Sequence, residues 1–234
     1  ICTMPTKKET FCVAPWYSLY IDSDKTITPC CKIKNNRKYT YKQLEEYFNS
    51  SELKSLREDL LNGVKNNACS HCWKDEEAGG DSLRLISNRT TGLFSKTPIQ
   101  EQLKNPKTSN IDSFDLVLGN LCNLKCTMCS PSLSSQLLAE VNLNPSLQKL
   151  YPADILSAKK YNWVKEDDFV NWCNKHLPDS INIQFTGGEP FIIPRTPTVI
   201  AKITDEQKKK CVLHFTTNLT IVNLGLFENL KTIT

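Results

Sequence analysis

The sequence predicts an α/β protein in which a small cysteine-rich α+β domain precedes alternating strands and helices. Two observations lead to this prediction. In the second half, three strand-like runs each end in a loop rich in Cys, Gly or Thr and Asn, with helical patterns between them. In the first part, cysteines follow short strand-like and helical segments. Because active sites in α/β folds form at the carboxyl ends of strands, we expect function at these loops.

Composition excludes several classes of protein. The 234 residues are 39% hydrophobic with a net charge of +4, which is ordinary for a globular protein. The sequence has neither a run of about 18 apolar residues nor a secretory leader, so we expect a cytoplasmic protein without a membrane partner. The basic run 208–210 predicts a solvated helix end rather than a nucleic-acid partner.

The chain starts at Ile1 and stops in a strand-like run. We therefore also expect this sequence to be a fragment of a longer protein.

The cysteine content points to metal chemistry. Eleven cysteines are many for a chain without a secretion signal, and an odd number argues against a closed set of disulfides. Most of them stand in C-x-x-C-like or adjacent groups, which favours metal or cluster binding. Cys173 and Cys211 lie within helical and strand-like patterns, and we expect these two to be small buried apolar residues.

The first cysteines flank a predicted hairpin. Residues 16–21 are aromatic and β-rich, residues 22–25 have turn chemistry, and residues 26–28 form the return strand. This arrangement places Cys12 and the Cys30–Cys31 pair at the same end of the hairpin.

Two helices then lead to a C-x-x-C pair. Thr40 and Gln43 predict a capping box for a short helix ending at Phe48. Leucines at helical spacing in 53–64 predict a second helix that stops near Gly63. That helix leads to Cys69 and Cys72.

Cys12, Cys30, Cys69 and Cys72 therefore form a candidate four-thiolate site, with Cys31 as the competitor of Cys30. Spacing alone supports zinc and an iron–sulfur cluster about equally. His71 is a further candidate zinc ligand, but a histidine between two ligands usually points elsewhere. A redox-active C-x-x-C is a third reading.

A less regular stretch separates the two parts of the chain. Gly79 and Gly80 interrupt the helical pattern, residues 82–89 are short and mixed, and residues 95–113 show little apolar periodicity. We therefore expect a first domain of residues 1–95, a linker of residues 96–112, and a second domain of residues 113–234.

The second domain opens with a strand and a cysteine loop. Residues 114–118 predict a strand, Cys122, Cys126 and Cys129 follow with C-x3-C-x2-C spacing, and Ser130 with Pro131 predicts a helix start. A [4Fe–4S] cluster normally takes four cysteines, so three leave one iron open to another ligand.

Two further strand-end loops follow. We expect a helix at 167–177, a strand at 181–185 ending in Gly187-Gly188-Glu189-Pro190, a helix at 200–210, and a strand at 211–215 ending in Thr217 and Asn218. Adjacent glycines let a backbone approach a ligand closely. Residues 231–234 predict the opening of a fourth strand.

These three loops in this order resemble the radical S-adenosylmethionine (SAM) enzyme family. The resemblance covers about residues 112–234 and implies a partial (β/α)6 barrel, that is, a truncated one. It implies that Cys122, Cys126 and Cys129 bind three irons of a [4Fe–4S] cluster while SAM chelates the fourth. It also implies that Gly187, Gly188 and Glu189 receive the methionyl amino group, and that Thr217 and Asn218 contact SAM.

The N-terminal part resembles the SPASM/twitch auxiliary-cluster domains of that family. The resemblance implies a second [4Fe–4S] cluster on Cys12, Cys30, Cys69 and Cys72. Here the domain precedes the barrel, whereas it usually follows it, and Lys25 occupies a turn position that is commonly glycine.

Together these resemblances imply an oxidoreductase that cleaves SAM reductively to a 5′-deoxyadenosyl radical for hydrogen abstraction. They further imply an electron donor such as a flavodoxin or ferredoxin and a peptide or protein substrate. The alternative is a non-catalytic iron–sulfur electron-transfer or metal-binding protein. A third reading is a zinc-stabilised interaction module, in which His214 would complete the Cys122–Cys129 site, although its place within a strand predicts a core histidine.

Overall fold

The computed structural model describes residues 9–33, 39–156, 167–222 and 224–230. The chain divides into two compact units, one of residues 1–21 and 26–115 and the other of residues 22–25 and 116–234. The fourth strand expected at residues 231–234 lies outside the described residues.

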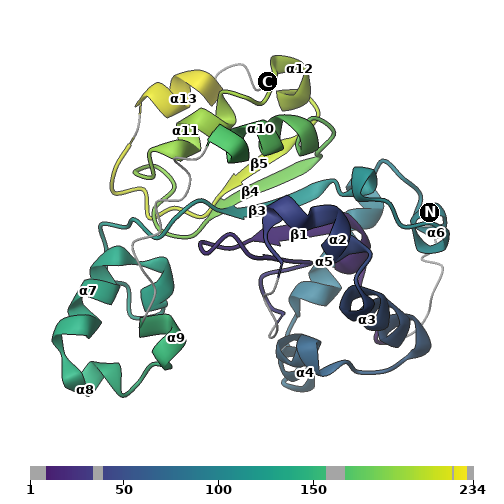
Figure 1. Cartoon of the computed structure of the whole chain (residues 1–234), viewed down its shortest axis with the longest axis horizontal. Coiled ribbons are helices and arrows are strands. Elements are labelled where there is room, and N and C mark those ends of the chain that lie inside the picture. Colours follow the sequence, from purple (N-terminus) through teal and green to yellow (C-terminus); the bar gives the residue numbers. More distant parts are fainter. Residues whose placement is uncertain (1–8, 34–38, 157–166, 223, 231–234) are drawn as a thin grey trace. The chain divides into compact units, whose positions relative to one another are not determined.

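The first unit mixes short strands with helices (Figure 1). Its helices and strands are α1 (Ala14–Tyr17), β1 (Ser18–Ile21), β2 (Ile27–Thr28), η1 (Tyr41–Gln43), α2 (Leu44–Phe48), α3 (Ser51–Asn62), η2 (Asn67–Cys69), α4 (Ser70–Glu77), α5 (Leu83–Phe94), α6 (Ile99–Lys104) and η3 (Thr108–Asn110). Strand β3 (Ser113–Val117) crosses the border between the units.

The predicted hairpin forms, but its first strand is shorter than expected. β1 pairs with β2 antiparallel, with Tyr20 opposite Thr28. The prediction of a strand at Trp16 and Tyr17 is wrong, because both lie in α1, where Pro15 occupies the first turn. Proline is compatible with the first turn of a helix, since its fixed φ is helical and the missing N–H has no partner there.

The turn of this hairpin explains the glycine preference at Lys25. Lys25 has φ of +74°, in the left-handed region, and its N–H donates to the Asp22 carbonyl at 2.9 Å. Glycine adopts such a conformation without steric cost, whereas other residues rarely do.

The two predicted helices before the C-x-x-C pair are confirmed. Thr40 and Gln43 form a capping box. In α3, Ser50 caps the N-terminus by accepting from Leu53 N at 3.2 Å, and Gly63 ends the helix with φ of +86°. Arg57 of α3 is buried. Its guanidinium donates to the carbonyls of Pro15 and Phe48 at 2.8–3.1 Å, and so holds α1, α2 and α3 together.

The region after the C-x-x-C pair is more regular than expected. Residues 83–89 lie in helix α5, so the prediction of a short mixed segment at residues 82–89 is wrong. The predicted linker 96–112 contains α6 and η3. Gln102 of α6 is fully buried, and its side-chain amide donates to the Trp16 carbonyl at 2.8 Å. Specific side-chain contacts within the first unit therefore organise this stretch.

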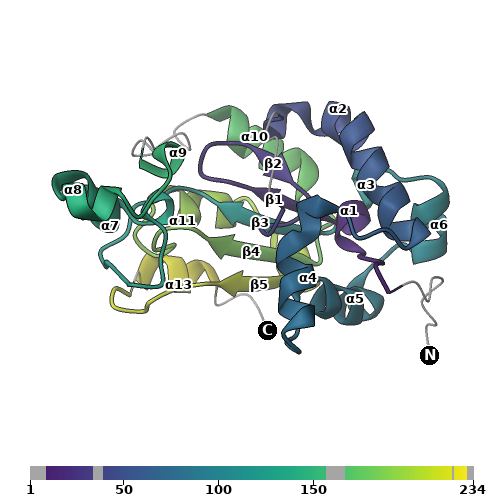
Figure 2. The same cartoon turned by 90° about the horizontal axis from the view of Figure 1, so that it is seen from below.

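The second unit begins with the end of β3 and continues as strand–helix alternation. Its further elements are η4 (Pro131–Leu133), α7 (Ser135–Leu143), α8 (Pro145–Gln148), α9 (Ala153–Leu156), α10 (Asp167–His176), β4 (Asn182–Thr186), α11 (Arg195–Ile200), α12 (Asp205–Lys208), β5 (Val212–Phe215) and α13 (Leu224–Leu230). β4 and β5 are parallel, with Ile183 opposite Leu213, and lie side by side in Figures 1 and 2. Within this part of the sheet, β4 lies between β3 and β5.

The α/β class is thereby confirmed, and the six-stranded barrel stays a prediction. The strands expected at 114–118, 181–185 and 211–215 correspond to β3, β4 and β5. The helix expected at 167–177 corresponds to α10, and the apolar side chains of this stretch are buried: Phe169, Val170, Trp172, Cys173 and Leu177. Cys211 is buried, as expected.

Three local predictions in this unit are wrong. The helix expected at 200–210 is interrupted, because Thr204 and Gln207 form a capping box that starts α12 anew. Lys208 is not solvated but buried, and its ammonium lies 3.1 Å from the Asp205 carboxylate. His214 is not a core histidine, since the side chains at alternate positions of β5, His214 among them, are exposed.

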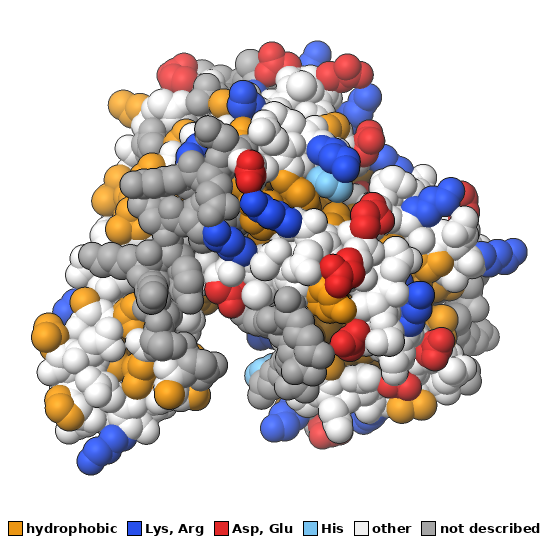
Figure 3. Space-filling view, viewed as in Figure 1, with side chains coloured by type: hydrophobic (Ala, Val, Ile, Leu, Met, Phe, Trp, Pro, Cys, Tyr) orange, Lys and Arg blue, Asp and Glu red, His pale blue; other side chains and the backbone are white. Residues whose placement is uncertain are grey.

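The surface carries mixed charge. On the face shown in Figure 3, Lys and Arg side chains are interspersed with Asp and Glu. Within the described segments, none of the helices combines the length and the apolar character that crossing a membrane requires.

Candidate iron–sulfur sites

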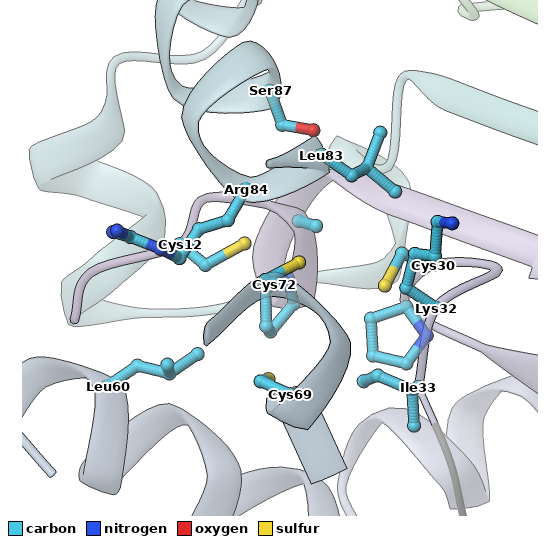
Figure 4. A pocket seen from close by; sticks show the side chains of 13 residues that line it. Cys12, Cys30, Lys32, Ile33, Leu60, Cys69, Cys72, Leu83, Arg84 and Ser87 are labelled. Carbon is cyan, nitrogen blue, oxygen red and sulfur yellow. The ribbon is translucent and has the colours of Figure 1, made fainter. Parts of the chain in front are cut away.

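The first unit contains a pocket lined by four cysteines. Cys12, Cys30, Cys69 and Cys72 all border it, and it holds about 410 Å³ of empty space, counting the part open to solvent. Figure 4 shows the sulfurs of Cys12, Cys30 and Cys72 directed toward one another from three separate segments. Aliphatic residues form much of the rest of the wall: Ala14, Pro15, Pro29, Ile33, Leu60 and Leu83.

Local structure places these cysteines. Cys69 ends η2 and Cys72 lies in the first turn of α4. Asn66 fixes this corner, since its side-chain oxygen accepts from Ala68 N at 2.8 Å and its carbonyl accepts from the Trp73 indole at 2.8 Å. The C-x-x-C pair is therefore held by the chain on both sides of it.

The structure distinguishes the two adjacent cysteines after β2. Cys30 is partly buried and lines the pocket, whereas Cys31 is exposed. Thr28 contributes to this arrangement, because its hydroxyl donates to the Cys30 carbonyl at 2.9 Å. The geometry thus favours Cys30 over Cys31 as the ligand.

Burial makes these thiols hard to ionise in the absence of a cation. It raises the pKa of Cys12 to about 12, with neighbouring Cys69 and Cys72 adding to the effect. Burial also raises the pKa of Cys69 to about 11 and that of Cys30 well above its usual range. Buried thiolates at such close quarters require a compensating positive charge. The four thiols of Cys12, Cys30, Cys69 and Cys72 therefore fit a cationic metal centre.

The spacing of the sulfurs bears on which metal centre fits. Among the described residues, no three Cys, His, Asp or Glu side chains are gathered as a single metal ion requires. A closed zinc site, with Zn–S bonds of about 2.3 Å, would bring its four sulfurs to within about 4 Å of one another. In the structure the four thiols that line the pocket are not gathered in this way, so their arrangement is not that of a closed zinc site.

The second unit carries the three remaining motif cysteines in the loop after β3. Cys122, Cys126 and Cys129 are all partly buried. Burial raises the pKa of Cys129, and charge on Cys122 and Cys126 raises it further, so the three thiols lie within electrostatic reach of one another. The loop closes on itself where Cys129 N donates to the Cys126 carbonyl at 3.0 Å.

Two serines before and at the start of α7 anchor this loop. Ser135 Oγ accepts from Cys122 N at 3.2 Å and lies 3.3 Å from the Cys122 carbonyl. Ser134 Oγ donates to the Leu124 carbonyl at 2.7 Å. The helix predicted to start at Ser130 therefore begins later than expected: Ser130 caps the short η4, and Ser134 caps α7.

The Gly-Gly-Glu loop after β4 lies directly against the start of the cysteine loop. Gly188 N donates to the Gly119 carbonyl at 3.0 Å, and Glu189 N donates to the Leu121 carbonyl at 2.8 Å. A Cβ atom on Gly188 would lie 2.2 Å from the Leu121 oxygen, and one on Gly187 would lie 2.7 Å from the Gly119 oxygen. Both glycines are thus required by the close approach of two backbones.

Glu189 joins the ends of β4 and β5. Its side chain is 1% exposed. One carboxylate oxygen accepts from Thr217 Oγ1 at 2.6 Å and the other from Asn218 N at 2.8 Å. The structure therefore brings together three of the predicted SAM contacts, with the Glu189 carboxylate engaged by Thr217 and Asn218.

Sequence reasoning missed two residues of this network. Asn218 Nδ2 donates to Asn123 Oδ1 at 3.1 Å, and Asn123 Nδ2 donates to Thr220 Oγ1 at 2.7 Å. Asn123 directly follows Cys122, so an amide inside the C-x3-C segment was the available signal.

Comparison with known proteins bears on the first unit. Residues 12–73 match the SPASM family, described as an iron–sulfur cluster-binding domain. This span begins at Cys12 and contains all four cysteines of the pocket. No curated protein and no solved structure matches the chain. The match supports an auxiliary iron–sulfur domain in the first unit.

Proposed function

We propose that this protein is a radical SAM enzyme with an auxiliary cluster. Cys122, Cys126 and Cys129 hold three irons of a [4Fe–4S] cluster, and SAM chelates the fourth through its amino and carboxylate groups. When bound and reduced, that cluster supplies the electron that cleaves SAM to methionine and a 5′-deoxyadenosyl radical, which abstracts hydrogen from the substrate. The SPASM match supports iron–sulfur binding in a protein of this type.

The observation that carries the proposal is the pair of backbone hydrogen bonds between the two loops. Gly188 N to Gly119 O and Glu189 N to Leu121 O hold the glycine loop against the segment that leads into Cys122. An electron carrier with a fully thiolate-ligated cluster would need no such apposed backbone beside a three-cysteine loop. A ligand that spans the open iron and the glycine loop accounts for both features.

The residues around this loop have defined roles in the proposal. Glu189 is a positioning residue, because its buried carboxylate orients Thr217 and the Asn218 backbone. Asn123 and Asn218, joined by their side-chain amides, keep the third strand end beside Cys122. Gly187 and Gly188, packed against Gly119 and Leu121, hold this loop beside the position proposed for the methionyl group.

The first unit supplies the auxiliary site. In the proposal, Cys12, Cys30, Cys69 and Cys72 hold a second [4Fe–4S] cluster in the pocket that they line. We propose an external electron donor of the flavodoxin or ferredoxin type, and a peptide or protein as the substrate that loses hydrogen.

Anaerobic reconstitution followed by a SAM-cleavage assay tests the catalytic claim. The reconstituted chain, reduced with dithionite in the presence of SAM, should form 5′-deoxyadenosine and methionine, both measured by chromatography. Cys126→Ala should abolish both products, while Cys31→Ala, which removes an exposed thiol outside the pocket, should retain them. Absence of 5′-deoxyadenosine from a chain that carries its full iron would overturn the catalytic claim.

A non-catalytic iron–sulfur electron-transfer protein is the second candidate. It is favoured by the position of the family match, which lies wholly within residues 12–73. Equilibrium binding of SAM separates the two candidates. The radical SAM enzyme requires binding that depends on Cys126, whereas the electron carrier has no use for SAM.

A further inference from the structure

Helix α5 forms a wall of the cysteine pocket although it lies beyond the span of the SPASM match. Leu83, Arg84 and Ser87 all line the pocket, and the match ends at residue 73. In Figures 1 and 2, α5 lies beside α4, the helix that carries Cys72. Figure 4 shows the Arg84 side chain running next to Cys12.

Arg84 is buried and held in one orientation. Its guanidinium makes a two-point contact with the Glu76 carboxylate, at 2.9 Å from Nε and 2.5 Å from Nη2. The third nitrogen, Nη1, donates to the Phe11 carbonyl at 2.8 Å, in the residue that precedes Cys12. The side chain is 6% exposed, against 21% for Glu76. Arg84 therefore ties α4 to the Cys12 segment and carries a permanent positive charge there.

Asn88 lies one turn further along the same face of α5 and holds the other side of Cys12. Its side-chain amide donates to the Phe11 carbonyl at 2.7 Å, and its side-chain oxygen accepts from Val13 N at 2.9 Å. The residues on both sides of Cys12 are therefore fixed by one side chain. Arg84 and Asn88 share the Phe11 carbonyl as an acceptor.

The charge on Arg84 reaches the thiols. Burial raises the pKa of Cys12 and of Cys69, and the Arg84 guanidinium acts in the opposite direction on both. In a pocket whose wall is largely aliphatic, a fixed charge acts more strongly than it would in water.

We propose that α5 belongs to the auxiliary site, with Arg84 as a positioning residue that raises the reduction potential of the cluster held by Cys12, Cys30, Cys69 and Cys72, and with Asn88 fixing Cys12 for ligation. This inference rests on the proposed auxiliary cluster. One-electron reduction from an external donor adds one negative charge to the cluster, and a nearby buried cation stabilises the reduced form. Charge and hydrogen bonding around the sulfurs are known determinants of such potentials.

Redox titration of the full chain, followed by electron paramagnetic resonance, tests the role of Arg84. The Cys126→Ala background removes the other proposed cluster, so that only the auxiliary cluster is titrated. Arg84→Gln should shift the reduction potential to a more negative value. Glu76→Gln, which removes the counter-charge but keeps an acceptor for Arg84, should shift it to a more positive value. Arg84→Lys should lie closer to the unsubstituted protein than Arg84→Gln does.

A matched control is present on the same helix. Arg89 of α5 pairs with Asp81 at 2.8 Å, but both side chains are more than half exposed, and neither borders the pocket. Arg89→Gln should leave the reduction potential unchanged.

The role of Asn88 is tested by the rate at which a chelator removes iron from the auxiliary cluster. Asn88→Ala should lose this iron several-fold faster than Arg89→Gln.

The opposite signs separate an electrostatic role from a structural one. Shifts of the same sign in Arg84→Gln and Glu76→Gln, or no shift in either, would overturn the role of Arg84. If Arg84→Gln loses its cluster, Glu76→Gln and Arg84→Lys decide the question. If the Cys126→Ala chain binds no auxiliary cluster at all, both the auxiliary site and this inference fail, whereas SAM cleavage by the second unit is judged separately.

Discussion

At Gly188, two backbones approach so closely that no side chain fits between them. We expect Gly188→Ala to force the loops apart, because its Cβ would lie 2.2 Å from the Leu121 oxygen. Overpacking of this kind costs about 1–3 kcal/mol of unfolding free energy. The variant should also lose iron from the Cys122 loop while keeping iron in the four-cysteine pocket, which iron analysis and denaturant unfolding measure.

Gly79→Ala is the control for this substitution. Gly79 has φ of +78° but no heavy atom within 4 Å of its would-be Cβ, so its cost is conformational only, about 1 kcal/mol. Iron content should not change in Gly79→Ala. Equal iron loss in the two variants would show that the apposed loops do not shape the Cys122 site.

Asp112 gives the stability of the protein a dependence on pH. Its side chain is buried, and burial raises its pKa to about 6, while a hydrogen bond with Ser95 and the backbone N–H of Lys96 act in the opposite direction. The folded state therefore holds this proton more tightly than the unfolded state, in which the pKa is about 3.9. Stability falls as the pH rises from about 4 to 6 and stays reduced above that range.

We therefore expect Asp112→Asn to stabilise the protein at pH 8 but not at pH 3.5. A difference of about two pKa units corresponds to at most about 3 kcal/mol. Urea unfolding at both pH values measures the change. Asp81→Asn, at the exposed pair with Arg89, should bring no such gain at pH 8, and a gain equal at both pH values would contradict this account.

At the scale of elements, the N-terminus of α3 matters because this helix leads the chain to Cys69 and Cys72. Ser50 is buried and satisfies the Leu53 N–H, so Ser50→Ala should lower the free energy of unfolding by about 1 kcal/mol. Ser51→Ala, at the adjacent exposed position, should stay within about 0.5 kcal/mol. Thermal unfolding followed by circular dichroism measures both, and equal losses would assign the cap to another group.

Strongly patterned elements were the predictable ones. The leucine spacing of α3 and the apolar face of α10 identify both helices, and the β-rich runs identify β3, β4 and β5. The prediction failed where a local start signal overrides a longer pattern. Pro15, in the first turn of α1, draws the start of the aromatic run into a helix, and the capping box of Thr204 and Gln207 divides a helical stretch.

Prediction of the candidate sites from the sequence is limited in the same way, because local patterns do not show contacts made at a distance along the chain. Cysteine spacing predicts both sets of thiols as ligands, because the distance between ligands along the chain is a feature of the sequence. Spacing could not choose between Cys30 and Cys31, since that choice depends on which side chain faces the pocket. The contacts of Arg84 and Asn88 with the Phe11 carbonyl span more than 70 residues, and no local pattern indicates them.

On the scale of the whole molecule, each unit builds its cysteine set from its own residues. The pocket of Cys12, Cys30, Cys69 and Cys72 lies in the first unit, and the loops around Cys122 lie in the second. In the described part of the chain, the backbone bonds between the cysteine and glycine loops and the bond from Cys122 to α7 join residues of the second unit: Gly119, Leu121, Cys122, Ser135, Gly188 and Glu189. We therefore expect the two centres to be lost independently.

Iron analysis of two single variants tests this independence. The reconstituted chain should bind about eight irons, four for each cluster. Cys72→Ala should retain about four irons and still form 5′-deoxyadenosine on reduction with SAM, because its Cys122 loop is untouched. Cys126→Ala should also retain about four irons but form none. Loss of all iron from either variant would show that the centres assemble together, and zinc in place of the four irons left in Cys126→Ala would assign the pocket to a structural metal.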